Sequence, residues 1–218
     1  MKNIVVISII LLLFGCSKDE LPTVKDIDGN EYHYITIGSQ VWMVENLKTS
    51  RYRNGDTIPS VTENTDWRNL TTGALCYYNN DSNNGKTYGI LYNWYVLDDN
   101  RMVAPSGWRV ATIEDWNTLI NYLGGTNIAG GKLKETGTSH WISPNSDASN
   151  TINFSALPAG IRDNHGNFTQ QRETAEWWIP KEYDSIVAWF TQIADGTSIQ
   201  VSEFGHKNSG LSIRCVKE

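Results

Sequence analysis

The chain has 218 residues, a formal net charge of −6 and an aromatic fraction of 11%, with nine Trp, ten Tyr and five Phe. An acidic chain lacks the basic face that nucleic acid requires, and its charge also argues against electrostatic binding to anionic lipid. The length suits one large domain or two small ones, and the 18 Gly residues predict a fold rich in turns.

The first 22 residues predict a signal peptide followed by a lipid anchor. Residues 1–15 carry one Lys and an apolar segment too short to cross a bilayer as a mature helix. The segment ends on Gly15-Cys16 and resembles the lipobox of bacterial lipoproteins, so Cys16 is the expected site of lipid attachment. Residues 16–22 then form the lipidated cysteine and a tether, whose acidic residues resemble the surface-export signal of Bacteroidetes lipoproteins. The alternatives are an ordinary signal peptide with a chance cysteine and a plain solvated tether.

Residues 23–218 predict one α+β domain with short antiparallel strands and much irregular loop. Asp28-Gly29 lies between two strand-like segments, which predicts a hairpin with a two-residue turn. Short strands are expected at residues 41–44 and 74–78. The aromatic segment at residues 88–95 is expected to be buried.

One clear helix is predicted to begin after Thr112. Thr112 can cap it, and Asp115 completes a start that resembles a capping box, with Asp in place of Glu. An apolar stripe follows at helical spacing, formed by Trp116, Leu119, Ile120 and Leu123. Gly124-Gly125 ends this helix, and a second, short helix is expected near residues 128–134.

From Glu135 onward the pattern predicts short strands and turns. Turns are expected at residues 163–167 and at Asp195-Gly196, because both segments contain typical turn residues. Residues 210–216 alternate apolar with polar side chains, which predicts a half-buried strand at the C-terminus.

Seven blocks in this order together resemble one family. The first is Gly38 to Lys48, with the sequence GSQVWMVENLK; the others lie at residues 71–81, 88–95, 105–108, 130–135, 157–163 and 212–216. They are similar to the Fibrobacter succinogenes major paralogous domain of exported bacterial proteins, from about Val24 to the C-terminus. The resemblance implies a fold related to C-type lectin-like domains. It implies no particular activity, because such a fold hosts many functions.

The cysteines depart from the family pattern. Ala104-Pro105 stands where the family usually has Cys-Pro. If that missing cysteine normally pairs with the one at position 215, Cys215 has lost its partner here. Cys76 and Cys215 are then candidates for a disulfide in an oxidising compartment, or both are buried free thiols.

Catalytic and metal sites have weak support in the sequence. Residues 80–85 resemble the start of a calcium loop, but Tyr92 stands where the bidentate Glu belongs, which favours a plain turn. Formylglycine-generating enzymes share a lectin-like fold and use a cysteine pair, although structural cysteines are favoured here. The carboxylates that could act in pairs are Asp98-Asp99, Glu114-Asp115 and Glu173 with Glu176. No catalytic residue, metal or cofactor is predicted.

The expected binding surface is formed by the loops at residues 163–175 and 195–208, because recognition residues concentrate on loops of a rigid scaffold. Most of Trp141, Trp177, Trp178 and Trp189 are expected in the core, with Trp177 kept as one candidate contact. The candidate ligand-binding residues are Asn164, His165, Gln170, Gln171, Arg172, Trp177 and His206.

We therefore expect a non-catalytic lipoprotein, held in the outer membrane by lipid and exposed at the cell surface, that binds a glycan or protein ligand and no nucleic acid. The alternatives are an enzyme on a fold like that of formylglycine-generating enzymes, and a structural envelope protein without a small ligand. A deep polar pocket would favour the enzyme, whereas a shallow patch of exposed aromatic side chains would favour glycan binding.

Overall fold

The computed structural model describes residues 20–194, 196 and 198–218. The predicted signal peptide, Cys16 and Asp195 of the predicted turn lie outside the described residues. Among the helices that are described, none combines the length and the apolar character needed to cross a membrane.

The chain ends in the same sheet in which it begins. This sheet, called the terminal sheet, has the strand order β1-β2-β3-β12-β6, and its neighbouring strands are antiparallel. Its strands are β1 (Thr23–Lys25), β2 (Glu31–Ile37), β3 (Gln40–Met43), β12 (Cys215–Lys217) and β6 (Trp108–Val110). Because β12 lies between β3 and β6, the C-terminus closes the domain.

The hairpin between β1 and β2 confirms the prediction at Asp28-Gly29, but its loop is longer than two residues. Lys25 pairs with Glu31, so residues 26–30 form the loop. A carboxylate oxygen of Asp26 accepts hydrogen bonds from the backbone N–H groups of Asp28 and Asn30, both at 2.9 Å. The predicted two-residue turn is therefore wrong, because the Asp26 side chain supplies the acceptors that shape a wider loop.

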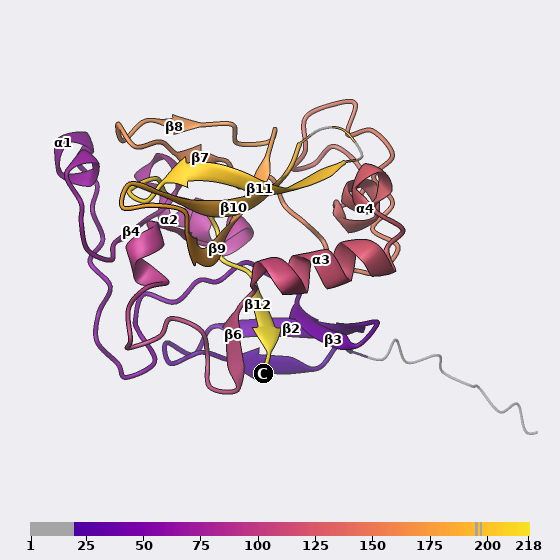
Figure 1. Ribbon diagram of the computed structural model, residues 1–218, viewed down its shortest axis with the longest axis horizontal. Coiled ribbons are helices and arrows are strands. Elements are labelled where there is room, and N and C mark those ends of the chain that lie inside the picture. The colour runs from indigo at the N-terminus through magenta and orange to yellow at the C-terminus, as the bar shows by residue number, and fades with distance from the viewer. Residues whose placement is uncertain (1–19, 195, 197) are drawn as a thin grey trace, which may run out of the picture.

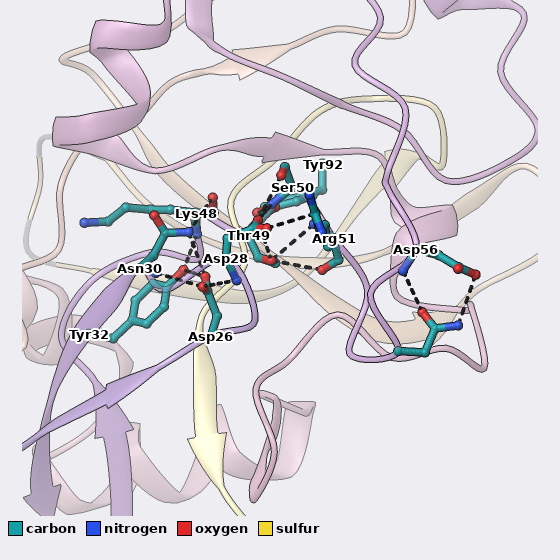
Figure 2. A network of polar contacts seen from close by, with 11 residues as sticks. Asp26, Asp28, Asn30, Tyr32, Lys48, Thr49, Ser50, Arg51, Asp56 and Tyr92 are labelled. Carbon is teal, nitrogen blue, oxygen red and sulfur yellow. Dashed lines mark hydrogen bonds and ion pairs between the residues drawn. The ribbon is translucent and has the colours of Figure 1, made fainter.

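Figure 2 shows that this hairpin loop is tied to the segment at residues 48–51. The Asp28 carboxylate accepts hydrogen bonds from the backbone N–H (2.6 Å) and hydroxyl (2.9 Å) of Ser50. The Tyr32 hydroxyl donates to Asp26 at 2.6 Å and accepts from the Lys48 N–H at 2.8 Å. Both carboxylates thus have structural partners within the protein.

A second sheet, called the long-strand sheet, lies above the terminal sheet in Figure 1, and α3 (Ile113–Tyr122) lies between them. Its order is β11-β10-β9, and its neighbours are antiparallel. The strands are β9 (Ala175–Glu182), β10 (Val187–Ile193) and β11 (Ile199–His206), each of seven or eight residues.

The prediction of only short strands after Glu135 is therefore wrong, as is the assignment of residues 195–208 to a loop. The first five residues of β9 are all buried, so they lack the alternation that marks a half-exposed strand. Register shifts beside Phe190 interrupt the pattern of β10.

Helix α3 confirms its prediction in detail. The Thr112 side chain accepts from the Asp115 N–H, and the Asp115 side chain accepts from the Thr112 N–H, which completes the capping box. Gly124 and Gly125 follow with φ of 98° and 104°, a backbone region that favours glycine. The second predicted helix is present as α4 (Thr126–Leu133), which begins two residues earlier than expected.

The loop-rich segments contain elements that were not predicted. Residues 80–85 were expected to form a plain turn, but α2 (Ser82–Tyr88) begins there because the Asp81 carboxylate accepts from the Asn83 N–H. The strand predicted at residues 74–78 is present as β4 (Leu75–Cys76). The remaining short elements are α1 (Asn64–Arg68), η1 (Tyr78–Asn80), η2 (Trp94–Val96), β5 (Leu91–Tyr92), β7 (Ile161–Arg162) and β8 (Phe168–Thr169). The mixed helices and antiparallel strands confirm the α+β prediction at this level.

One core cluster joins the two sheets. It contains side chains from β2 and β3, from α3 and α4, and from all three strands of the long-strand sheet. Trp42, Trp116, Phe154 and Trp177 form its aromatic centre, called the buried aromatic cluster, and each is 0% exposed. Arg214 lies against it, with its guanidinium carbon 4.3 Å from the Phe154 ring centre and 5.6 Å from the Trp177 ring centre.

Candidate functional site

The predicted binding residues of the segment at residues 163–175 have mainly structural contacts. The turn between β7 and β8 is confirmed: an Asp163 oxygen accepts from the N–H groups of His165 (2.9 Å) and Asn167 (2.8 Å). Gln171 donates to the Asn84 side chain at 3.1 Å. Arg172 donates to the backbone carbonyls of Thr138 and Ser139, both at 3.1 Å, so its guanidinium holds a neighbouring loop.

The other candidates differ in their exposure. Gln170, His165 and His206 are exposed. Asn164 is half-buried, and its backbone carbonyl accepts from the Asn208 side chain at 3.3 Å. Trp177 is fully buried, and its indole N–H donates to Asn46 at 2.8 Å. The prediction that Trp177 contacts a ligand disagrees with this burial, because no face of its ring reaches solvent.

Cys76 and Cys215 are buried free thiols, which is one of the two alternatives left open by the sequence; the other alternative, a disulfide between them, is not formed. Cys76 packs beside Trp67 and Leu91, whereas Cys215 packs in another cluster with Ala104 and Trp108. Burial raises the pKa of each thiol to about 12. A nucleophilic cysteine needs its thiolate, and these surroundings disfavour that form.

The predicted carboxylate pairs are also separated by their own contacts. Asp99 accepts two hydrogen bonds from the Arg101 side chain, which lower its pKa to about 2. Asp115 caps α3 and forms an ion pair with Arg109. Glu176 is 4% exposed and accepts from Gln192 at 2.8 Å, and burial raises its pKa to about 7. One carboxylate of each predicted pair, Asp99, Asp115 or Glu176, therefore has a local structural role.

The long-strand sheet carries a different feature, a group of exposed rings. Tyr183, Trp189 and Phe204 form this exposed aromatic cluster, with ring centres 4.4 Å apart for Tyr183–Phe204, 4.5 Å for Trp189–Phe204 and 6.2 Å for Tyr183–Trp189. Tyr183 is 60% exposed, Phe204 is 47% exposed and Trp189 is half-buried. Rings that contact one another while remaining accessible form a shallow apolar surface.

Local backbone contacts explain why these rings meet. Trp189 on β10 is directly paired with Phe204 on β11, so their side chains lie on the same face of the sheet. The Asp184 carboxylate accepts from the N–H groups of Ile186 (2.7 Å) and Val187 (2.8 Å), which shapes the β9–β10 turn beside Tyr183. These hydrogen bonds lower the pKa of Asp184, so it stays ionised and keeps the turn.

The flank of the exposed aromatic cluster is polar. The Lys181 ammonium lies 5.3 Å from the centre of the Trp189 ring. Near the β9–β10 turn, Lys207 forms an ion pair with Glu182 at 2.7 Å and lies over the Trp94 ring. Aromatic faces are electron-rich, so they attract the weakly positive C–H groups on the flat side of a sugar ring, while the flanking ammonium can donate to its hydroxyls.

The sequence analysis missed this surface. Trp189 was assigned to the group of mostly core tryptophans, and Phe204 was placed inside a loop. The sequence did contain a signal for a strand in this segment, because Val187, Trp189 and Thr191 alternate with residues whose side chains would point to the opposite face. The contact with Tyr183 depends on the turn geometry, which single-residue preferences do not specify.

Comparison with known proteins gives one result. The family model described as Fibrobacter succinogenes major domain matches residues 35–217, which confirms the resemblance found in the sequence. This range includes the buried aromatic cluster, Arg214 and the exposed aromatic cluster. No curated protein and no solved structure matches the chain.

Proposed function

We propose, from the premise that this chain belongs to the Fibrobacter succinogenes major domain family, that it is a non-catalytic surface lipoprotein that binds glycan. The observation that carries this proposal is the exposed aromatic cluster of Tyr183, Trp189 and Phe204. It is a shallow patch of accessible rings, the kind of surface that favours glycan binding over catalysis. A relation to C-type lectin-like domains is part of the proposal, and the antiparallel α+β architecture is compatible with it.

The position of the cluster supports a display role. The described chain begins beside β1 in the terminal sheet, at the bottom of Figure 1, whereas the long-strand sheet lies in the upper half. If Cys16 carries lipid, the tether joins the domain at the terminal sheet, whereas the exposed aromatic cluster belongs to the long-strand sheet. A ligand at the cell surface then meets a sheet to which the tether is not joined.

The binding part of the proposal is tested by a glycan-array screen of the detergent-solubilised chain, run with calcium and again with EDTA. We expect saturable binding to a defined glycan that Trp189→Ala weakens at least about tenfold, since losing a stacking ring removes more than about 1.4 kcal/mol. Tyr122→Ala is the matched control, because Tyr122 is 63% exposed on α3, outside the cluster.

The outcomes of this screen separate the alternatives. Binding that Trp189→Ala leaves unchanged would contradict the assignment of the cluster, and loss of binding in EDTA would indicate a calcium-dependent site. Absence of binding under both conditions would favour a protein partner or a structural role in the envelope. Cross-linking on intact cells would then distinguish these two.

The anchoring part is tested separately with Cys16→Ser. We expect the native chain to incorporate radiolabelled palmitate and to partition into the detergent phase, and the variant to do neither, because multiple acyl chains are needed for stable anchoring. Incorporation of label by the variant would contradict Cys16 as the attachment site. Surface exposure is then measured by protease digestion of intact cells that express the native chain.

A further inference from the structure

A polar cleft lies apart from the exposed aromatic cluster and shares no residue with it. Thr57, Thr71, Thr72, Tyr95, Asp98 and Arg101 line it, and its volume is about 380 Å³. Small-molecule sites commonly have volumes of about 300–1,000 Å³ and combine an apolar face with a few placed polar groups. We call it the threonine cleft.

One side of the threonine cleft is held in place by charged contacts. Arg101 donates to Asp99 through Nε at 2.9 Å and Nη2 at 2.6 Å, and through Nη1 to Asp56 at 3.1 Å. Its guanidinium also lies 4.1 Å from the centre of the Tyr52 ring. A side chain fixed in this way loses little conformational entropy when a ligand binds.

The other side carries polar groups without protein partners. Within the described part of the chain, the Asp98 carboxylate and the hydroxyls of Thr57, Thr71 and Thr72 accept or donate no hydrogen bond, and all four residues are exposed. They can therefore bind a ligand without first breaking an internal contact.

A buried hydroxyl lies directly behind the wall of the cleft. Tyr52 is 0% exposed, and its hydroxyl lies beside Asp99 and Arg101, the ion pair that holds one side of the cleft. A Cβ atom added to Gly73, which also lines the cleft, would lie only 2.1 Å from that hydroxyl. The missing side chain of Gly73 thus leaves room for the Tyr52 hydroxyl at the cleft wall, where it supports the position of Asp99 and Arg101.

We propose that the threonine cleft binds an uncharged, hydroxyl-rich ligand the size of a sugar ring. The threonine hydroxyls and Asp98 provide acceptors, Arg101 provides donors, and the half-buried Tyr95 ring provides a face for stacking. The net negative charge of Asp98, Asp99 and Arg101 disfavours an anionic ligand, and the guanidinium disfavours a metal cation. This site is independent of the proposed function at the exposed aromatic cluster.

The test is saturation-transfer NMR on the detergent-solubilised chain with D-glucose, D-galactose, D-xylose and N-acetyl-D-glucosamine as separate probes. We expect saturable transfer to at least one of them. Asp98→Ala should weaken that binding at least about tenfold, since hydrogen bonds to charged groups exceed the free energy of one decade in affinity. The double variant Thr71→Val/Thr72→Val should also weaken it, whereas Thr169→Val, at an exposed threonine on β8, should not.

The double variant Thr71→Val/Thr72→Val keeps the test decisive if Asp98→Ala disturbs folding, because Val has nearly the same shape as Thr and both positions are exposed. Trp189→Ala distinguishes the two sites, since it should leave monosaccharide binding at the threonine cleft unchanged. The proposal is overturned if none of the four sugars binds, or if binding survives Asp98→Ala and the double valine variant. It is also overturned if Trp189→Ala alone abolishes the binding.

Discussion

Strand β9 connects two groups of aromatic side chains that differ in only a few respects. Trp177, near its start, belongs to the buried aromatic cluster, and Tyr183, directly after its end, belongs to the exposed one. Ring centres in the buried cluster lie 4.9 Å apart for Trp42–Trp116 and 5.2 Å for Trp116–Trp177, similar to the 4.4 Å between Tyr183 and Phe204. Ring contact alone therefore does not distinguish a core from a binding surface.

The two clusters differ in whether their polar groups and ring faces contact other parts of the protein or solvent. In the buried cluster Asn46 accepts from both the Trp177 indole (2.8 Å) and Arg214 (2.9 Å). Arg214 is 1% exposed, and it also donates to the backbone carbonyls of Met43, Val44 and Phe154. In the exposed cluster the cation is Lys181, an exposed side chain over one face of Trp189. In the buried cluster Trp177 and Arg214 thus have internal partners, although the Trp116 indole N–H has none among the described residues, whereas the rings of the exposed cluster remain accessible.

The largest predicted difference in stability comes from removing one ring from the buried aromatic cluster and one from the exposed aromatic cluster. Trp177→Ala should lower the free energy of unfolding by about 3–5 kcal/mol, because it creates a cavity and removes one of the hydrogen bonds that Asn46 accepts. Trp189→Ala should lower it by less than Trp177→Ala does, because Trp189 packs against the edge of the same core cluster but is half-exposed. Urea denaturation of both variants measures the two values. Equal losses would remove the distinction between the clusters.

The next test removes the cationic side chain that lies against each cluster, Arg214 in the buried one and Lys181 in the exposed one. Arg214→Met should cost roughly 2–4 kcal/mol, since each buried acceptor left unpaired costs about 1–3 kcal/mol and relief of charge burial offsets only part of this. Lys181→Met should change the free energy of unfolding by less than about 0.5 kcal/mol, as is usual for surface positions. A stability gain for Arg214→Met would show that its hydrogen bonds do not stabilise the core.

The pH dependence of stability should also come from the buried part of β9. Burial raises the pKa of Glu176 from 4.5 to about 7, so between these values the folded state binds more protons than the unfolded state. The contribution of Glu176 to stability is full below pH 4.5 and is lost as pH rises through about 7. The free energy of unfolding falls by at most about 3 kcal/mol over this range.

Denaturation at pH 5 and pH 8 checks this expectation. Glu176→Gln should reduce the difference in stability between the two pH values, because its amide does not titrate. Glu63→Gln, at an exposed residue directly before α1, should preserve that difference. If both variants retain the native pH dependence, Glu176 is not its source.

Local features of the fold could be predicted from the sequence because short segments determine them. The capping box of Thr112 and Asp115, the hairpins near Asp28 and Asp163, and the burial of Trp141 and Trp178 were all predicted and are confirmed. In each case one or two side chains satisfy the nearby backbone, or a large apolar side chain seeks the core.

Contacts between distant segments could not be predicted in this way. The pairing of Trp189 with Phe204 depends on the register of β10 and β11, and the surroundings of Arg214 combine residues from several segments far apart in the chain. The alternation of apolar and polar residues at 210–216 also did not indicate that the Arg214 guanidinium would be fully buried.

The most direct test of the central claim is calorimetric titration of the best array glycan into the native chain, Trp189→Ala and Tyr122→Ala, each with its unfolding transition measured in the same buffer. We predict that Trp189→Ala unfolds close to the native transition and binds at least about tenfold more weakly. Tyr122→Ala should bind like the native chain. Native-like affinity in Trp189→Ala, with a native-like transition, would contradict a glycan site at the exposed aromatic cluster.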